Sequence, residues 1–105
     1  MIQLWFLPIN DIFRPISSHE QKIASTLSPT KAKEYVFSRG HIRYILSSFF
    51  EMPALQIPLN TPLGKAPSLG NNLGNITFSH CKDALLVGWS KQNLGVDIEL
   101  SLIHI

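Results

Sequence analysis

The chain has 105 residues, a length that suits one small domain, residues 1–105, with a modest core. Hydrophobic residues make up 45% of it and charged residues only 15%, an apolar balance for a small monomer that favours a buried partner surface. Nine Lys and Arg against seven Asp and Glu give a net charge of +2. This bias is too small to indicate a general nucleic-acid-binding protein.

The single cysteine and the first residues bear on the cellular compartment. Cys81 has no second cysteine with which to form an internal disulfide, which favours a reducing compartment. Residues 1–8 are apolar but have no basic leader and include Pro8, so they fit neither a signal peptide nor a membrane span. We therefore expect a cytoplasmic protein without membrane contact.

The first half of the chain predicts one strand and two helices. Residues 2–7 are rich in strand formers and precede turn residues. Ser17 or Ser18 can cap a short helix, with Glu20 or Gln21 three residues later. The dipeptide at 28–29, Ser-Pro, predicts the start of a longer helix that continues to about Phe50, because apolar residues then recur at threes and fours.

The second half predicts strands joined by turns. Residues 53–74 contain four prolines and three glycines, which indicates an extended connection with a short strand near 55–59. Two strands, near 76–78 and 84–89, flank the polar turn 79–83, and a further strand at 94–100 would complete an antiparallel hairpin. The expected class is α+β, with a small, mostly antiparallel sheet packed on one long helix and a shorter one.

Two carboxylates lie close together in the last predicted strand. Asp97 and Glu99 alternate with apolar residues, so both point to one face of that strand. Carboxylate oxygens suit hard cations, and magnesium takes one or two carboxylates and completes its octahedron with water and phosphate oxygens. The alternative is an ordinary solvated strand face.

Basic and polar residues form three further candidates. Lys65 lies on a loop between Gly64 and Ala66-Pro67, where it can reach a phosphate or simply face solvent. Ser79 and His80 follow an apolar strand and can bind phosphoryl oxygens or cap the turn. A third set is spaced by four along the long helix and is expected to form a basic, solvated face: Lys31, Tyr35, Arg39 and Arg43.

Four short motifs in a fixed order are more specific than any one of them. They are Ser-Arg-Gly-His-Ile-Arg at 38–43, Gly-Lys-Ala-Pro at 64–67, Phe-Ser-His-Cys-Lys-Asp at 78–83 and Gly-Val-Asp-Ile-Glu at 95–99. In identity, order and rough spacing the chain resembles the N-terminal half of a 4′-phosphopantetheinyl transferase of the larger, pseudo-dimeric type. The resemblance covers roughly residues 28–100 and implies one half of a pseudo-two-fold α/β fold.

The resemblance implies transfer of the phosphopantetheine arm of coenzyme A to a serine of an acyl or peptidyl carrier protein, with magnesium. It assigns Asp97 and Glu99 as magnesium ligands at the coenzyme A pyrophosphate and Lys65 as a ligand contact. It also assigns Ser79 and His80 to the phosphates, where His80 would stabilise charge on the leaving pyrophosphate oxygen. Arg39 matches the arginine-bearing helix of the family as a cofactor contact.

The sequence departs from the family in two places. Ala66 separates Lys65 from Pro67, where most relatives place proline directly after the lysine. The signature of the family's C-terminal half, of the type Trp-x-x-Lys-Glu, does not occur, and the chain offers no obvious replacement for the general base. We therefore expect a truncated chain that is inactive alone and exposes an apolar face, through which two copies could pair.

Two other classes of function stay open at this stage. One is a non-catalytic interaction module that self-associates through an exposed apolar face and is indifferent to coenzyme A. The other is a small RNA-binding domain that uses Lys31, Arg39 and Arg43 with Tyr35 or Phe37 for stacking. The small net charge and the absence of an aromatic-rich strand pair weigh against it. The pathway served, and the roles of Lys31 and Arg43, stay open.

Overall fold

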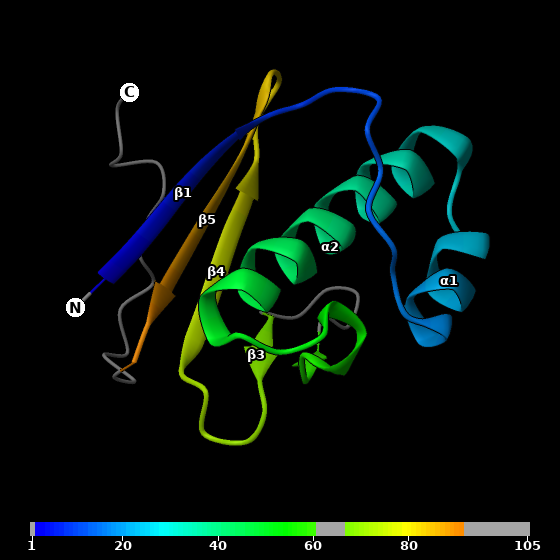
Figure 1. The fold of residues 1–105 in the computed structure, drawn as a ribbon. Helices are drawn as coiled ribbons and strands as arrows, with labels where there is room; N and C mark the ends of the chain where they lie inside the picture. The colour runs from blue at the N-terminus through cyan, green and yellow to red at the C-terminus, as the bar shows by residue number, and fades with distance from the viewer. Residues whose placement is uncertain (1, 61–66, 92–105) are drawn as a thin grey trace. The chain divides into compact units, whose positions relative to one another are not determined.

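The computed structural model describes residues 2–60 and 67–91. The described elements, in chain order, are β1 (Ile2–Pro8), α1 (Ser18–Ser25), α2 (Pro29–Phe50), the 3₁₀ helix η1 (Ala54–Gln56), β2 (Leu59–Asn60), β3 (Ser68–Leu69), β4 (Asn75–His80) and β5 (Ala84–Ser90) (Figure 1). The chain divides into two compact units, one of residues 1–9 and 58–105 and one of residues 10–57. The predicted class is confirmed as α+β, with two helices and a small antiparallel sheet.

The first unit contains a three-stranded sheet in the order β1-β5-β4, and both pairings are antiparallel. The central strand β5 is buried along its whole length, with Leu85 and Val87 fully covered. Val87 lies opposite Trp5 on one side and Phe78 on the other. The three strands expected at 2–7, 76–78 and 84–89 are thus confirmed, each with one or more additional residues.

The turn between β4 and β5 is shorter than the sequence predicts. Ser79 and His80 were expected in the turn, but they are the last two residues of β4 and lie opposite Leu86 and Leu85. The reason is that the hydrogen bonds between β4 and β5 continue to the first residue of β5, Ala84. Its carbonyl accepts from the Cys81 amide at 2.8 Å, directly after the last residue of β4. A long buried partner strand therefore extends β4 beyond its apolar residues.

The connection at residues 53–74 is only partly as predicted. The strand expected near 55–59 is wrong, because Ala54–Gln56 is a 3₁₀ turn in which the Gln56 amide donates to the Pro53 carbonyl at 3.0 Å. Pro58 has no N–H for a ladder, and β2 begins after it at Leu59. β2 pairs with β3 as a two-stranded antiparallel ribbon.

Both helices begin where their caps predict. Ser17 accepts from the Glu20 amide, and the Glu20 carboxylate accepts from the Ser17 amide at 2.9 Å, which is a complete capping box. Ser28 caps α2, and Pro29 is its first residue. The long helix ends at Phe50, as expected, and Glu51 after it adopts a left-handed conformation with φ 55°.

In the second unit, the segment before α1 packs closely on one side of α2. A Cβ atom at Gly40 would lie 2.3 Å from the Arg14 carbonyl oxygen, so only glycine fits there. At the next residue, the His41 ring donates through Nε2 to the Ile12 carbonyl at 2.7 Å, because a carbonyl can only accept. The His41 and Phe37 rings are 4.3 Å apart. These contacts hold residues 12–14 against the helix.

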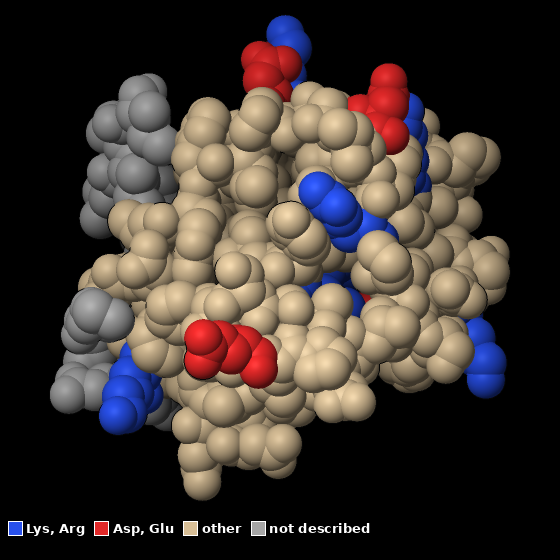
Figure 2. All heavy atoms as spheres, in the orientation of Figure 1, with Lys and Arg blue, Asp and Glu red and all other residues tan. Residues whose placement is uncertain are grey.

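Charged groups are sparse on the surface. Figure 2 shows the Lys and Arg side chains of the viewed face as separated groups rather than as one basic patch. No helix in residues 2–60 and 67–91 is both long enough and apolar enough to cross a bilayer.

Candidate functional site

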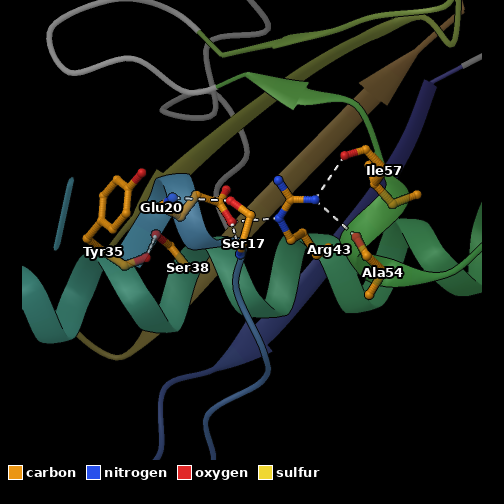
Figure 3. A network of polar contacts seen from close by, with 7 residues as sticks. All are labelled: Ser17, Glu20, Tyr35, Ser38, Arg43, Ala54 and Ile57. Atoms are coloured by element: carbon orange, nitrogen blue, oxygen red, sulfur yellow. Dashed lines mark hydrogen bonds and ion pairs between the residues drawn. The ribbon is translucent and has the colours of Figure 1, made fainter. Parts of the chain in front are cut away.

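A buried arginine joins three segments of the second unit (Figure 3). Arg43, on α2, donates through Nε to Glu20 at 2.7 Å. Its Nη1 donates to the carbonyls of Ala54 at 3.0 Å and Ile57 at 2.9 Å. The same Glu20 oxygen accepts from the Ser17 amide. One carboxylate therefore caps α1 and neutralises the arginine that holds the chain after α2.

This arrangement corrects the expectation of a solvated basic face. The side chains of Arg43 and Glu20 are only 4% and 3% exposed, and Tyr35 is also buried. A buried guanidinium needs a carboxylate partner and further acceptors, and this one has both. Arg43 is therefore a structural residue, whereas Lys31 is exposed as expected.

The predicted ligand contact Arg39 lies on the same helix in a different environment. Its guanidinium carbon lies 4.2 Å from the centroid of the Tyr35 ring, and Nη1 donates to Ser38 Oγ at 2.9 Å. Burial lowers the pKa of Arg39, while Tyr35 and Glu20 oppose this change by favouring the charged form. The Tyr35 hydroxyl is buried, and no hydrogen-bond partner for it is found among the described residues. The Arg39 guanidinium is thus a partly desolvated cation beside the aromatic ring of Tyr35.

The motif at residues 38–43 can now be divided by exposure. Five of its six residues are buried, and Arg39 is the exception, being half-buried. Gly40 and His41 hold residues 12–14, and Arg43 forms the ion pair with Glu20. A soluble ligand that meets this motif therefore meets Arg39.

Ser79 and His80 come from the other unit, at the end of β4. His80 is exposed and Ser79 is half-buried, with its Oγ 3.9 Å from Cys81 Sγ. Because side chains alternate along a strand, the two point to opposite faces of the sheet. Ser79 and His80 are therefore neighbours at the end of β4, but their side chains lie on opposite faces. A ligand bound on one face of the sheet can contact the side chain of only one of them.

The remaining predicted site residues are Lys65, Asp97 and Glu99, and all three lie outside the described residues. Within residues 2–60 and 67–91, no group of three or more His, Cys, Asp and Glu side chains is placed to hold a metal ion.

Two polar features were missed at the level of sequence. Glu20 was identified as a capping residue but not as the partner of Arg43, although the Ser-x-x-Glu pattern fixes where its carboxylate lies. An open hollow beside the β3–β4 turn is lined by Asn71, Asn72 and Lys91, among others. Both asparagines there have positive φ, which the Gly-Asn-Asn run at 70–72 could have indicated.

Comparison of the chain with protein-family models, with curated proteins and with solved structures yields no match. The family resemblance thus depends on the four motifs and their order alone.

Proposed function

We propose that this chain binds coenzyme A and magnesium as the N-terminal half of a 4′-phosphopantetheinyl transferase fold. The order of the four motifs supports the proposal. The observation that carries it from the described residues is the exposure pattern of residues 38–43, in which Arg39 alone is not buried. A guanidinium that has already lost part of its hydration gives up less solvation when it binds a phosphate.

The proposed roles follow from the chemistry of each group. Asp97 and Glu99 hold magnesium against the pyrophosphate, since hard carboxylate oxygens suit that ion. Lys65 contacts the ligand as a point charge, and Arg39 can bind a phosphate through two N–H groups. His80, exposed at the end of β4, stabilises charge on the leaving oxygen. In the family, the general base that activates the carrier serine belongs to the other half, so for these 105 residues we propose a binding role.

Isothermal titration calorimetry with coenzyme A, in the presence and absence of magnesium, tests the proposal. We expect binding that magnesium strengthens and an Asp97→Ala variant in which the magnesium-dependent part is lost, because only the metal bridge is removed. The control is Asp11→Ala, which removes an exposed carboxylate whose side chain is 93% accessible. Absence of both heat and thermal shift at saturating ligand concentrations would refute the proposal.

The role of Arg39 has a matched control in the same unit. Arg14 also stacks on a tyrosine, with its guanidinium carbon 3.9 Å from the centroid of the Tyr44 ring. Loss of one charge-assisted phosphate contact costs about 1.5–3 kcal/mol, so Arg39→Met should weaken coenzyme A binding by a factor between about 10 and about 140. Arg14→Met should leave the affinity unchanged. Equal losses in the two variants would assign Arg39 a merely structural role.

The second candidate, an interaction module, is favoured by one specific observation. Large apolar side chains lie about half exposed on β1, among them Phe6 at 54%. Indifference to coenzyme A together with stable self-association would select this function over the first.

A further inference from the structure

The hydroxyl of Ser38 contacts two neighbours on α2. Ser38 is buried, and its Oγ donates to the Tyr35 carbonyl at 3.0 Å (Figure 3). A hydroxyl has one proton and a carbonyl can only accept, so the lone pairs of Oγ remain for donors. Arg39 is such a donor, and its Nη1 lies 2.9 Å from Ser38 Oγ. The bond to the backbone therefore fixes Ser38 as an acceptor for the Arg39 guanidinium.

The Tyr35 ring gives the same guanidinium a second contact. Tyr35 lies one turn before Arg39 on α2 and is buried, and its ring centroid is 4.2 Å from the Arg39 guanidinium carbon. A cation at this distance from an aromatic ring is attracted to its face. The ring restrains the position of the guanidinium, and the bond to Ser38 restrains its rotation about the Nε–Cζ bond. Since Tyr35 and Ser38 are both buried, packing holds their side chains in turn.

Arg14 stacks on a tyrosine without the same support. Its guanidinium carbon lies 3.9 Å from the centroid of the Tyr44 ring, but Tyr44 is 50% exposed. Arg14 Nε is buried, and no hydrogen-bond partner for it is found among residues 2–60 and 67–91. Stacking on a tyrosine therefore does not by itself supply an acceptor. The hydroxyl of Ser38 is what distinguishes the surroundings of Arg39.

We propose that Ser38 and Tyr35 are positioning residues that hold the Arg39 guanidinium in the orientation in which it binds a phosphate of coenzyme A. This inference rests on the proposed function. Orientation matters because a planar guanidinium binds phosphate through two parallel N–H groups. A long side chain that is already ordered also loses less conformational freedom on binding, and the usual loss corresponds to a factor between about 2 and about 12 in affinity.

Isothermal titration calorimetry with coenzyme A and magnesium tests the inference through a double-mutant cycle. Ser38→Ala should weaken binding by a factor between about 2 and about 12, because Arg39 must then be ordered by the ligand. In an Arg39→Met background the same change should have no further effect, because the group that Ser38 positions is gone. The matched control is Ser47→Ala, which removes another hydroxyl of α2 that donates to a carbonyl, that of Met52 at 2.6 Å. It should leave the affinity unchanged.

Two further measurements test the contacts separately. Tyr35→Leu removes the aromatic ring and should weaken binding, whereas Tyr35→Phe keeps the ring and should restore most of the affinity. NMR spectroscopy of the guanidinium N–H groups needs no ligand. In the free wild-type chain we expect slow rotation of the Arg39 guanidinium about its Nε–Cζ bond, and Ser38→Ala should make this rotation fast.

Two outcomes would overturn this inference while the wild-type chain still binds coenzyme A. One is a Ser38→Ala variant that binds as well as the wild type, or loses the same affinity in the Arg39→Met background, because an effect on the fold alone does not depend on Arg39. The other is fast guanidinium rotation in the free wild-type chain. Absence of coenzyme A binding by the wild-type chain would instead refute the proposed function, and this inference with it.

Discussion

The ion pair between Arg43 and Glu20 gives the sharpest test of the described structure. Arg43→Met keeps the length of the side chain but leaves the Glu20 carboxylate buried without a cation and removes the donor from two carbonyls. Breaking a buried pair from one side costs about 3–5 kcal/mol, because the remaining charge cannot regain its hydration. A small domain has a total stability of about 5–15 kcal/mol, so the variant should be close to unfolding.

Urea denaturation followed by circular dichroism measures this loss as a change in the free energy of unfolding. The double variant Glu20→Gln with Arg43→Met should recover about 2 kcal/mol of the loss, because no buried charge remains and glutamine keeps the capping box. The matched control is Lys33→Met, which breaks the exposed pair of Lys33 with Asp11 and should change nothing measurable. If Arg43→Met lowers the free energy of unfolding no more than Lys33→Met does, the stabilising role of the buried Arg43–Glu20 ion pair is refuted.

Three further changes test local features of the second unit. Gly40→Ala usually stabilises a helix, but here the added Cβ meets the Arg14 carbonyl, so we expect a loss of about 1–3 kcal/mol in the same assay; a gain would contradict the close packing. Glu51 follows α2 in a left-handed conformation that glycine adopts without strain, so Glu51→Gly should stabilise the fold by about 1 kcal/mol and raise the melting temperature. An unchanged melting temperature would mean that the turn is not strained. Ser17→Ala removes the cap of α1 and should cost about 0.5–2 kcal/mol, whereas Ser17→Thr should retain most of the stability.

The features that the sequence predicted well are those set by neighbours in the chain. The capping box at Ser17 and the Ser-Pro start at residue 28 need only local hydrogen bonds and a fixed proline φ, so the helices begin where expected. The first strand is similar, because its strand formers precede clear turn residues. Where the outcome depends on a distant partner the prediction failed, as for His80, whose place in β4 is fixed by pairing with Leu85.

For the candidate site too, the sequence suggests residue types but not the distant contacts that place them. Residue type and order suggested Asp97, Glu99 and Lys65, but they lie outside the described residues, so their placement stays a prediction. Arg39 and Arg43 lie four residues apart on one helix, and the sequence favoured Arg39 as a ligand contact but left the role of Arg43 open. What separates them is burial against residues 17–20 and 54–57, which no local pattern encodes.

Helix geometry explains why a spacing of four misled the expectation of one basic face. An α-helix turns about 100° per residue, so each step of four rotates the side chain by about 40°. From Lys31 to Arg43 this rotation amounts to about 120°, enough to go from solvent to the interior. Arg39 lies between the two, half-buried, and it is the position where a charge is partly desolvated and still accessible. It follows that a loss of coenzyme A binding in an Arg39 variant would report on the ligand. The same loss in an Arg43 variant would report only on the fold.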